Sequence, residues 1–183
     1  MTRIAREDFT TLYFHIMVQG INKEFIFEKE KFKEKYKRLL SENLRKSKVK
    51  LLSYCIMDNH VHMLSYTKNP KEMSKLMQKI NTSYAIYYNK VNNRVGVVFR
   101  NRFTTQPINS RRQLYNCLIY IHNNPVKAGI VKNPNDYKYS SYGEWITGKQ
   151  IIDEQCAQLV YNEELKDIKK FKEMHLRNEI LDI

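Results

Sequence analysis

The order of strand-like and helix-like segments constrains the fold of this chain more than any other feature of its sequence. Four segments rich in aromatic and β-branched residues predict strands, and four segments with apolar residues at helical spacing predict helices. The strands are expected at 9–20, 49–57, 60–66 and 95–105, and the helices at 28–46, 70–87, 111–123 and 162–181. This order predicts an α+β sandwich, in which helices cover one face of an antiparallel sheet and leave the other face available.

Two of the expected helices begin with capping signals. Asn69 can cap a helix whose first residue is Pro70, and Ser110 with Gln113 forms a capping box for the helix over 111–123. After that helix the chain is dense in turn-forming residues, which predicts a loop to about residue 150.

The chain carries a large excess of positive charge. Its 32 Lys and Arg residues exceed its 19 Asp and Glu residues, for a formal net charge of +13. This balance favours a polyanionic partner, with nucleic acid as the first candidate and an anionic membrane surface as the second. Most of the 13 Tyr and 8 Phe are expected in the core, but some could stack on unpaired bases. Arg100 and Arg102 are candidates for DNA backbone contact, and the alternative is a solvated strand face.

Neither membrane insertion nor secretion is expected. The 183 residues suffice for one domain with a proper core. No apolar run approaches the roughly 18 residues of a membrane span, and the first ten residues lack the apolar centre of a signal peptide. Cys55, Cys117 and Cys156 are widely spaced, which favours reduced thiols over a disulfide framework or a zinc site. A cytoplasmic protein is therefore expected.

Two of the five histidines, His60 and His62, are separated by one residue in an expected strand. Side chains alternate along a strand, so both imidazoles are expected on one face, where they could hold a metal ion or play a structural or surface role. The helix over 111–123 places Tyr120 and Asn124 one turn apart, at one edge of its apolar stripe. Because Asn124 precedes a proline, we expect it in the last turn or just outside, where it could also serve as a cap.

Three segments, in this order, give the chain a resemblance to a known family. They are "MDNHVHML" at 57–64, "GVVFRNRF" at 96–103 and "YIHNNPVKAGIV" at 120–131. Together they resemble the single-tyrosine HUH transposases, especially the branch of REP-associated tyrosine transposases. Residues 1–150 are accordingly expected to form a transposase-like domain, and residues 151–183 a charged C-terminal helical extension.

The resemblance implies a ferredoxin-like core and roles for four residues. A divalent metal ion, Mg²⁺ or Mn²⁺, would be held by His60, His62 and Asn124. Tyr120 would be the nucleophile of a DNA transposase that cuts and rejoins single-stranded DNA at hairpin-flanked sites, through a 5′-phosphotyrosine intermediate. The protein would act as a monomer or a homodimer. Asp58 stands where the family often has proline, which loosens the turn before His60 and could bring a carboxylate near the metal.

Two alternatives remain open from the sequence. One is a catalytically silent nucleic-acid-binding module, and the other is a metal-dependent nuclease that uses water as its nucleophile. Among the remaining histidines, His15 could neighbour the site, although a core or hydrogen-bonding role is favoured for it, and His122 is expected to be exposed.

Overall fold

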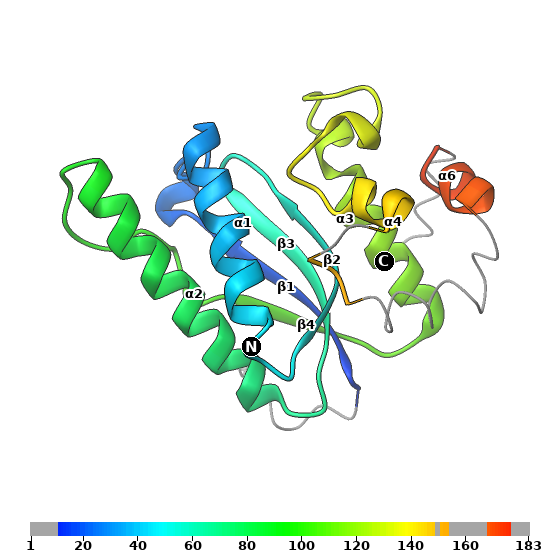
Figure 1. Cartoon of the computed structure of the whole chain (residues 1–183), viewed down its shortest axis with the longest axis horizontal. Helices are drawn as coiled ribbons and strands as arrows, with labels where there is room; N and C mark the ends of the chain where they lie inside the picture. Colours follow the sequence, from blue (N-terminus) through cyan, green and yellow to red (C-terminus); the bar gives the residue numbers. More distant parts are fainter. Residues whose placement is uncertain (1–10, 149–150, 154–167, 177–183) are drawn as a thin grey trace.

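The computed structural model of the chain describes residues 11–148, 151–153 and 168–176, and its centre is a four-stranded antiparallel sheet (Figure 1). The strands are β1 (Tyr13–Gln19), β2 (Lys50–Ile56), β3 (His60–Tyr66) and β4 (Thr104–Ile108), in the order β2-β3-β1-β4. Helix α1 (Glu30–Leu44) joins β1 to β2, and helix α2 (Pro70–Val91) joins β3 to β4. This is the ferredoxin-like arrangement, so the predicted α+β class and antiparallel sheet are confirmed.

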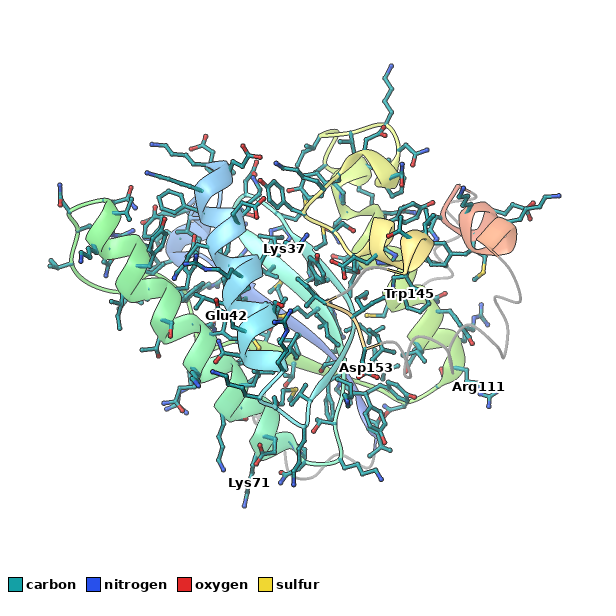
Figure 2. All side chains as sticks on the ribbon, viewed as in Figure 1. Lys37, Glu42, Lys71, Arg111, Trp145 and Asp153 are labelled. Carbon is teal, nitrogen blue, oxygen red and sulfur yellow. The ribbon has the colours of Figure 1, made fainter. Side chains whose placement is uncertain are left out.

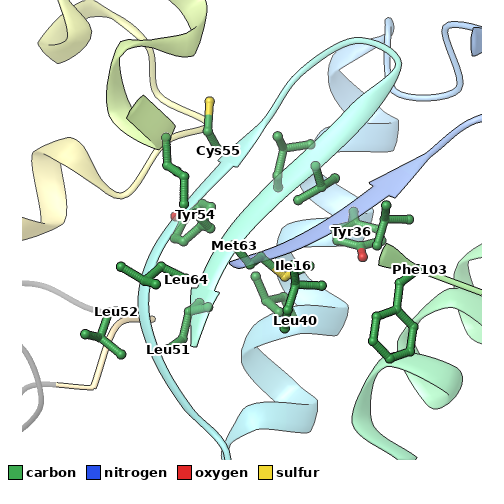
Figure 3. Close-up of a cluster of buried hydrophobic side chains, with 14 of the residues drawn as sticks. Ile16, Tyr36, Leu40, Leu51, Leu52, Tyr54, Cys55, Met63, Leu64 and Phe103 are labelled. Atoms are coloured by element: carbon green, nitrogen blue, oxygen red, sulfur yellow. The ribbon is translucent and has the colours of Figure 1, made fainter. Parts of the chain in front are cut away.

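Helices α1 and α2 cover one face of the sheet and enclose its main core (Figure 1). Alternation along β1 sends Phe14, Ile16 and Val18 to this face, where each is buried. Ile16 lies close to Tyr36 and Leu40 of α1 in this core (Figure 3). Burial of this continuous apolar layer is what fixes the register of the strands.

The capping signals are confirmed. The Asn69 side chain accepts a hydrogen bond from the N–H of Lys71 (2.9 Å) at the start of α2. The Ser110 hydroxyl accepts one from the N–H of Gln113 (3.2 Å), at the start of a third helix, α3 (Arg111–Lys127). Gln113 in turn accepts a hydrogen bond from the N–H of Asn109 (2.8 Å), which anchors the chain just before the helix.

Helix α3 packs over β2 and β3 on the other face of the sheet, which was expected to stay open. Its Tyr120 ring contacts His15 and His62, whose side chains alternate with the core-facing residues of β1 and β3. The apolar stripe expected on this helix is buried as predicted, with Leu118 and Ile121 at most 1% exposed. The prediction was wrong because it placed all helices on the first face. The second face of the sheet also carries side chains that α3 buries.

The strand predicted at 95–105 is wrong in its position. The continuous ladder with β1 begins at Thr104 and runs on through Pro107, which an edge strand tolerates because its outer N–H groups need no ladder partner. Before it, the segment makes only an isolated bridge, between Gly20 and Phe99. Val95 and Val97 have exposed fractions of 93% and 62%, whereas Val98 and Phe99 are buried. Only part of this segment is therefore buried, and that part lies outside the continuous strand.

Helix α3 continues through Pro125, whereas the prediction ended it near residue 123. The Asn124 side chain donates from Nδ2 to the Tyr120 carbonyl (3.0 Å), so it bonds to the helix itself. The Pro125 ring is buried, and this packing offsets the N–H that proline lacks. The helix ends in a Schellman motif, in which Gly129 has a positive φ of 70° and its N–H donates to a carbonyl of the last turn.

Two further helices lie in the C-terminal part of the chain. Helix α4 (Tyr142–Thr147) occupies part of the segment predicted as loop, and α6 (Ile168–Leu176) lies within the helix predicted for 162–181, whose other residues fall outside the described ones. The Trp145 ring of α4 stacks on Phe171 of α6, with centroids 5.5 Å apart. Among the described residues, no helix is both long and apolar enough to cross a membrane.

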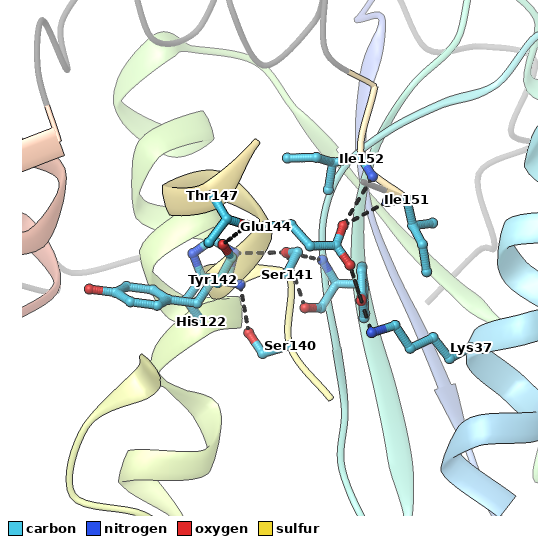
Figure 4. Close-up of polar contacts among 11 residues, drawn as sticks. Lys37, His122, Ser140, Ser141, Tyr142, Glu144, Thr147, Ile151 and Ile152 are labelled. Carbon is cyan, nitrogen blue, oxygen red and sulfur yellow. Dashed lines mark hydrogen bonds and ion pairs between the residues drawn. The ribbon is translucent and has the colours of Figure 1, made fainter. Parts of the chain in front are cut away.

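Glu144 of α4 ties this helix to the main body (Figure 4). One carboxylate oxygen accepts from the Tyr54 hydroxyl of β2 (2.5 Å), and the other from the N–H of Ile151 (2.8 Å). Residues on both sides of the predicted boundary at 150 therefore share one set of contacts.

Candidate active site

His60 and His62 lie on β3, with their imidazoles on the face that α3 covers. The ring centroids are 4.7 Å apart and the ring planes are nearly perpendicular, at 84°. Asp58, in the turn before the strand, forms an ion pair with Lys33 of α1 (2.6 Å). The Asp58 carboxylate thus binds a helix on the first face of the sheet. The His60 and His62 imidazoles point to the other face, toward α3.

The protonation of the His60 ring follows from its neighbour Asn59. Nδ1 of His60 lies 2.5 Å from Oδ1 of Asn59, while the Asn59 amide nitrogen donates to the carbonyl of Lys23 (3.3 Å). That second bond fixes the amide orientation, so a neutral His60 carries its proton on Nδ1 and exposes the lone pair of Nε2. Burial lowers the pKa of His60, which favours this neutral form, against the opposing effect of a hydrogen bond to Asn124.

His62 is more deeply buried, with only 3% of its surface exposed. Burial, together with repulsion from His60 and His15, lowers its pKa to about 2. His62 is therefore neutral at physiological pH. Its Nδ1 lies 2.9 Å from Nε2 of His15, a residue of β1.

Helix α3 brings Tyr120 and Asn124 to the imidazoles. The Tyr120 ring meets the His62 ring edge-on, with centroids 5.3 Å apart at 76°. One turn later, Asn124 hydrogen-bonds to His60 while its amide nitrogen donates to the Tyr120 carbonyl. All four residues predicted for the site, two from β3 and two from α3, thus come together, although they are up to 64 positions apart in the sequence.

The donor set of this site fits a divalent cation. Two neutral imidazoles and one amide oxygen can bind Mg²⁺ or Mn²⁺ and would leave positions open for phosphate and water. A neutral His60 with its proton on Nδ1 has one in-plane lone pair, on Nε2, and that lone pair could bind a cation. Within the described ranges, no group of three or more His, Cys, Asp or Glu side chains is placed to hold a metal, so any such site depends on Asn124.

A known family matches this chain over the residues that build the site. The model of the family "Transposase IS200 like" matches residues 8–124, a span that runs from the start of β1 to Asn124. The chain belongs to the IS200-like transposase family. Membership implies a DNA-processing enzyme and DNA transposition as its activity.

One solved structure of a transposase shares the fold of this family member. A REP-associated tyrosine transposase bound to a REP hairpin superposes with a TM-score of 0.66 at 16% identity, over 84% of this chain and 90% of that one. A putative transposase from Deinococcus radiodurans R1 gives a TM-score of 0.43 at 10% identity, over 62% of this chain and 92% of that one. No curated protein matches the chain.

One basic side chain lies beside Tyr120 of this transposase. Lys127 places its ammonium 5.2 Å from the centre of the Tyr120 ring. Arg100 and Arg102 are exposed, and the N–H of Arg100 donates to the carbonyl of Gln19, the residue that pairs with His60 across the sheet. The backbone of Arg100 thus lies next to the end of the sheet that carries His60, and the carbonyl of Arg102 accepts from Asn81 of α2 (2.8 Å).

Sequence reasoning missed Gln106, which lies next to the site, and it misplaced His122, whereas the hydrogen-bonding role expected for His15 is observed. His15 and Gln106 face each other across β1 and β4, and the Gln106 side chain hydrogen-bonds the His15 imidazole. Strand alternation could place His15 on a face but could not reveal the register that sets it beside His62. His122, expected to be exposed, is fully buried and bonded to His175 of α6 (2.9 Å).

Proposed function

We propose that this transposase is a site-specific, single-strand DNA endonuclease and strand transferase that acts through Tyr120. The observation that carries the proposal is the meeting of Tyr120 with His62, and of Asn124 with His60, across one helix-to-strand contact. The tyrosine, both imidazoles and the amide all belong to the same chain. This supports a site completed by a single protomer, so that a monomer would suffice even if the protein also forms a homodimer.

The proposed reaction exchanges one phosphodiester bond for another. Oη of Tyr120 attacks the phosphorus and loses its proton as the new bond forms, while the bond from phosphorus to the 3′ oxygen breaks and that oxygen takes up a proton. The products are a 5′-phosphotyrosyl link and a free 3′-hydroxyl. A 3′-hydroxyl can later attack the phosphotyrosine, so strands are rejoined without an external energy source.

The chain's residues each have a part in this reaction. A phenol is a weak nucleophile at neutral pH unless it is assisted and positioned. Mg²⁺ or Mn²⁺, when bound by His60, His62 and Asn124, would neutralise charge on the phosphate and orient it for in-line attack. The β3 ladder holds the two imidazoles, and α3 holds Tyr120 one turn from Asn124, which fixes the direction of attack.

The substrate is proposed to be single-stranded DNA next to a hairpin. The net charge of +13 and the exposed Arg100 and Arg102 support a nucleic-acid partner. The similar REP-associated transposase was solved with a REP hairpin, which supports a hairpin as the mark of the target. Residues 151–183 are proposed to form an extension that braces α3, because α6 packs on α3 and α4.

The decisive experiment is a Tyr120→Phe substitution, which removes one oxygen and keeps the ring. Wild-type protein incubated with Mn²⁺ and hairpins taken from the DNA that flanks the gene should leave a covalent protein–DNA species on a denaturing gel. Tyr120→Phe should bind the same DNA and form no adduct, whereas the control Tyr88→Phe, on α2 and away from the site, should form it normally.

Mass spectrometry of the trapped peptide separates the proposal from its alternatives. A nucleotide on any tyrosine other than Tyr120 would show that the nucleophile is wrongly assigned. Cleavage across a panel of hairpins without any adduct would indicate a nuclease that uses water, and binding without cleavage would indicate a silent binding module.

A further inference from the structure

The sheet brings His15 and Gln106 into line with His62. Pairing across β1 and β3 sets Met17 opposite His62, so His15, two residues away on the same face, is its diagonal neighbour. Pairing across β1 and β4 sets Gln106 directly opposite His15. Three strands therefore contribute one residue each to a row that leads from the edge of the sheet to His62.

The two imidazoles share one hydrogen bond, so one ring donates and the other accepts. Nε2 of His15 is engaged with Nδ1 of His62 at 2.9 Å, so its other nitrogen, Nδ1, is the one available to Gln106. When the amide oxygen of Gln106 accepts from that nitrogen, the His15 proton sits on Nδ1. A neutral His15 with its proton on Nδ1 must accept at Nε2. His62 must then donate from its own Nδ1.

We propose that His15, backed by Gln106, is a positioning residue that holds His62 in the tautomer with a free Nε2. This inference rests on the proposed function, in which His62 binds the metal ion through that nitrogen. His60 needs no such help from the sheet, because Asn59 beside it already fixes its proton on Nδ1. The two proposed ligands are thus oriented by different contacts. The neighbouring residue Asn59 orients His60, whereas His15 and Gln106, on two other strands, orient His62.

Groups that orient a metal-binding histidine through its other nitrogen typically change metal affinity by about 10–100-fold when they are removed. Two substitutions of His15 separate this role from simple packing. His15→Phe keeps a ring of similar size but has no acceptor, while His15→Gln can place an amide oxygen close to the position of Nε2. If His15 only fills space, the phenylalanine should be the better replacement; if it positions His62, the glutamine should be.

The first measurement is the tautomer of His62 in the full-length, metal-free protein, read from two-bond ¹H–¹⁵N correlations of ¹⁵N-histidine. We expect the proton on Nδ1 in wild type and in His15→Gln, and a shift toward Nε2 in His15→Phe. Gln106→Leu, at the exposed edge strand where folding is not at risk, should shift the population in the same direction but by less. An unchanged tautomer in both His15→Phe and Gln106→Leu would overturn the proposal.

The second measurement is Mn²⁺ affinity by calorimetry on the same proteins. His15→Phe should weaken binding at least about tenfold, and His15→Gln should weaken it much less. His62→Ala is the reference for loss of a ligand. If His62→Ala abolishes binding while His15→Phe leaves it intact, this proposal fails and the metal site stands. If His62→Ala changes nothing, His62 is not a ligand, and the metal site of the proposed function fails together with this inference.

Discussion

The imidazoles of His60 and His62 are kept neutral by burial, yet the two residues differ in what surrounds them. His60 is half-buried and lies between Asn59 and Asn124, whereas His62 is enclosed by His15 and Tyr120. A neutral imidazole is the form that binds a metal ion, so the burial that lowers the pKa of both residues also prepares them as ligands. Asp58 is paired with Lys33, yet its negative charge still acts on His60 and opposes the lowering of its pKa by burial.

A glycine controls the end of the helix that carries Tyr120. Gly129→Ala would place a Cβ in open space but at a φ of 70°, which an L-residue adopts at a cost. We expect a loss of about 1 kcal/mol in the free energy of unfolding, measured by urea denaturation. Gly143→Ala, within α4 and equally free of contacts, is the matched control and should be neutral or slightly stabilising. Equal effects of the two substitutions would contradict this account of the helix end.

At the scale of elements, α3 is held from both sides. Its inner side packs on the sheet, and its outer side meets α6 through His122. The two ring nitrogens of His122 form hydrogen bonds with His175 and with Ser141. His175 Nδ1 donates to the carbonyl of Phe171 (2.7 Å), so its Nε2 accepts from His122 Nδ1 (2.9 Å), and His122 Nε2 then accepts from the Ser141 hydroxyl (2.8 Å). This chain of bonds requires both rings to be neutral.

The contact between α3 and α6 should make stability depend on pH. Burial lowers the pKa of His175 to about 4, from a value near 6.5 in an unfolded chain. The unfolded state therefore binds more protons between these values, so stability is full above pH 6.5 and is lost as the pH falls toward 4. The loss from His175 is on the order of 3 kcal/mol, unless α6 detaches first.

Trp145, the single tryptophan of the chain, stacks on Phe171 of α6 and so reports on this contact. Urea unfolding followed by its fluorescence should show falling stability between pH 6.5 and pH 4. His175→Phe should make the dependence shallower, though not flat, because burial also lowers the pKa of His122 well below its usual range. An unchanged slope in His175→Phe would show that His175 is not the group that titrates.

The sequence predicted elements well where the signal is local. The caps at Asn69 and Ser110 depend on residues within one turn, and both helices begin where predicted. The strand at 95–105 was misplaced because pairing with β1 depends on a partner some 90 residues away. Pro125 misled the prediction because burial of its ring outweighs its local tendency to end a helix.

The site was predictable in unequal parts. Strand alternation alone set His60 and His62 on one face, and helical spacing set Tyr120 one turn from Asn124. Physical reasoning could not have chosen Tyr120 among 13 tyrosines, and only the resemblance to a family did so. His15 and Gln106 were out of reach, because their relation to His62 exists only once three strands are in register.

At the scale of the whole molecule, positive charge is spread over many elements. Lys71 of α2 and Arg111 of α3 extend outward from different parts of the body (Figure 2). Net charge of this size attracts DNA from any direction, but it does not by itself direct a strand to Tyr120. We propose that Arg100 and Arg102 supply that direction, because the backbone of Arg100 bonds to Gln19, which pairs with His60.

Salt dependence distinguishes such local contacts from general attraction. Removing one phosphate contact to single-stranded DNA should reduce the slope of log K against log salt by about 0.7. We expect this reduction in Arg100→Ala, measured by fluorescence anisotropy on a hairpin with a single-stranded flank. Arg38→Ala, an exposed arginine on α1 that pairs with Glu42, removes the same charge from the opposite face and should leave the slope nearly unchanged. Equal slopes for both variants would argue against a specific path past Arg100.

Tyr120 and Asn124 lie on the same helix, so displacement of α3 affects both of them together. Under the proposed function, the nucleophile and one metal ligand move as a single rigid body, and the two imidazoles stay with the sheet. A displaced α3 takes both of its groups away at once, so no arrangement retains three ligands while lacking the tyrosine. Such an arrangement would let water cut DNA and leave an unsealed break. Under the proposed function, a copy with a displaced α3 is therefore expected to be inert toward DNA.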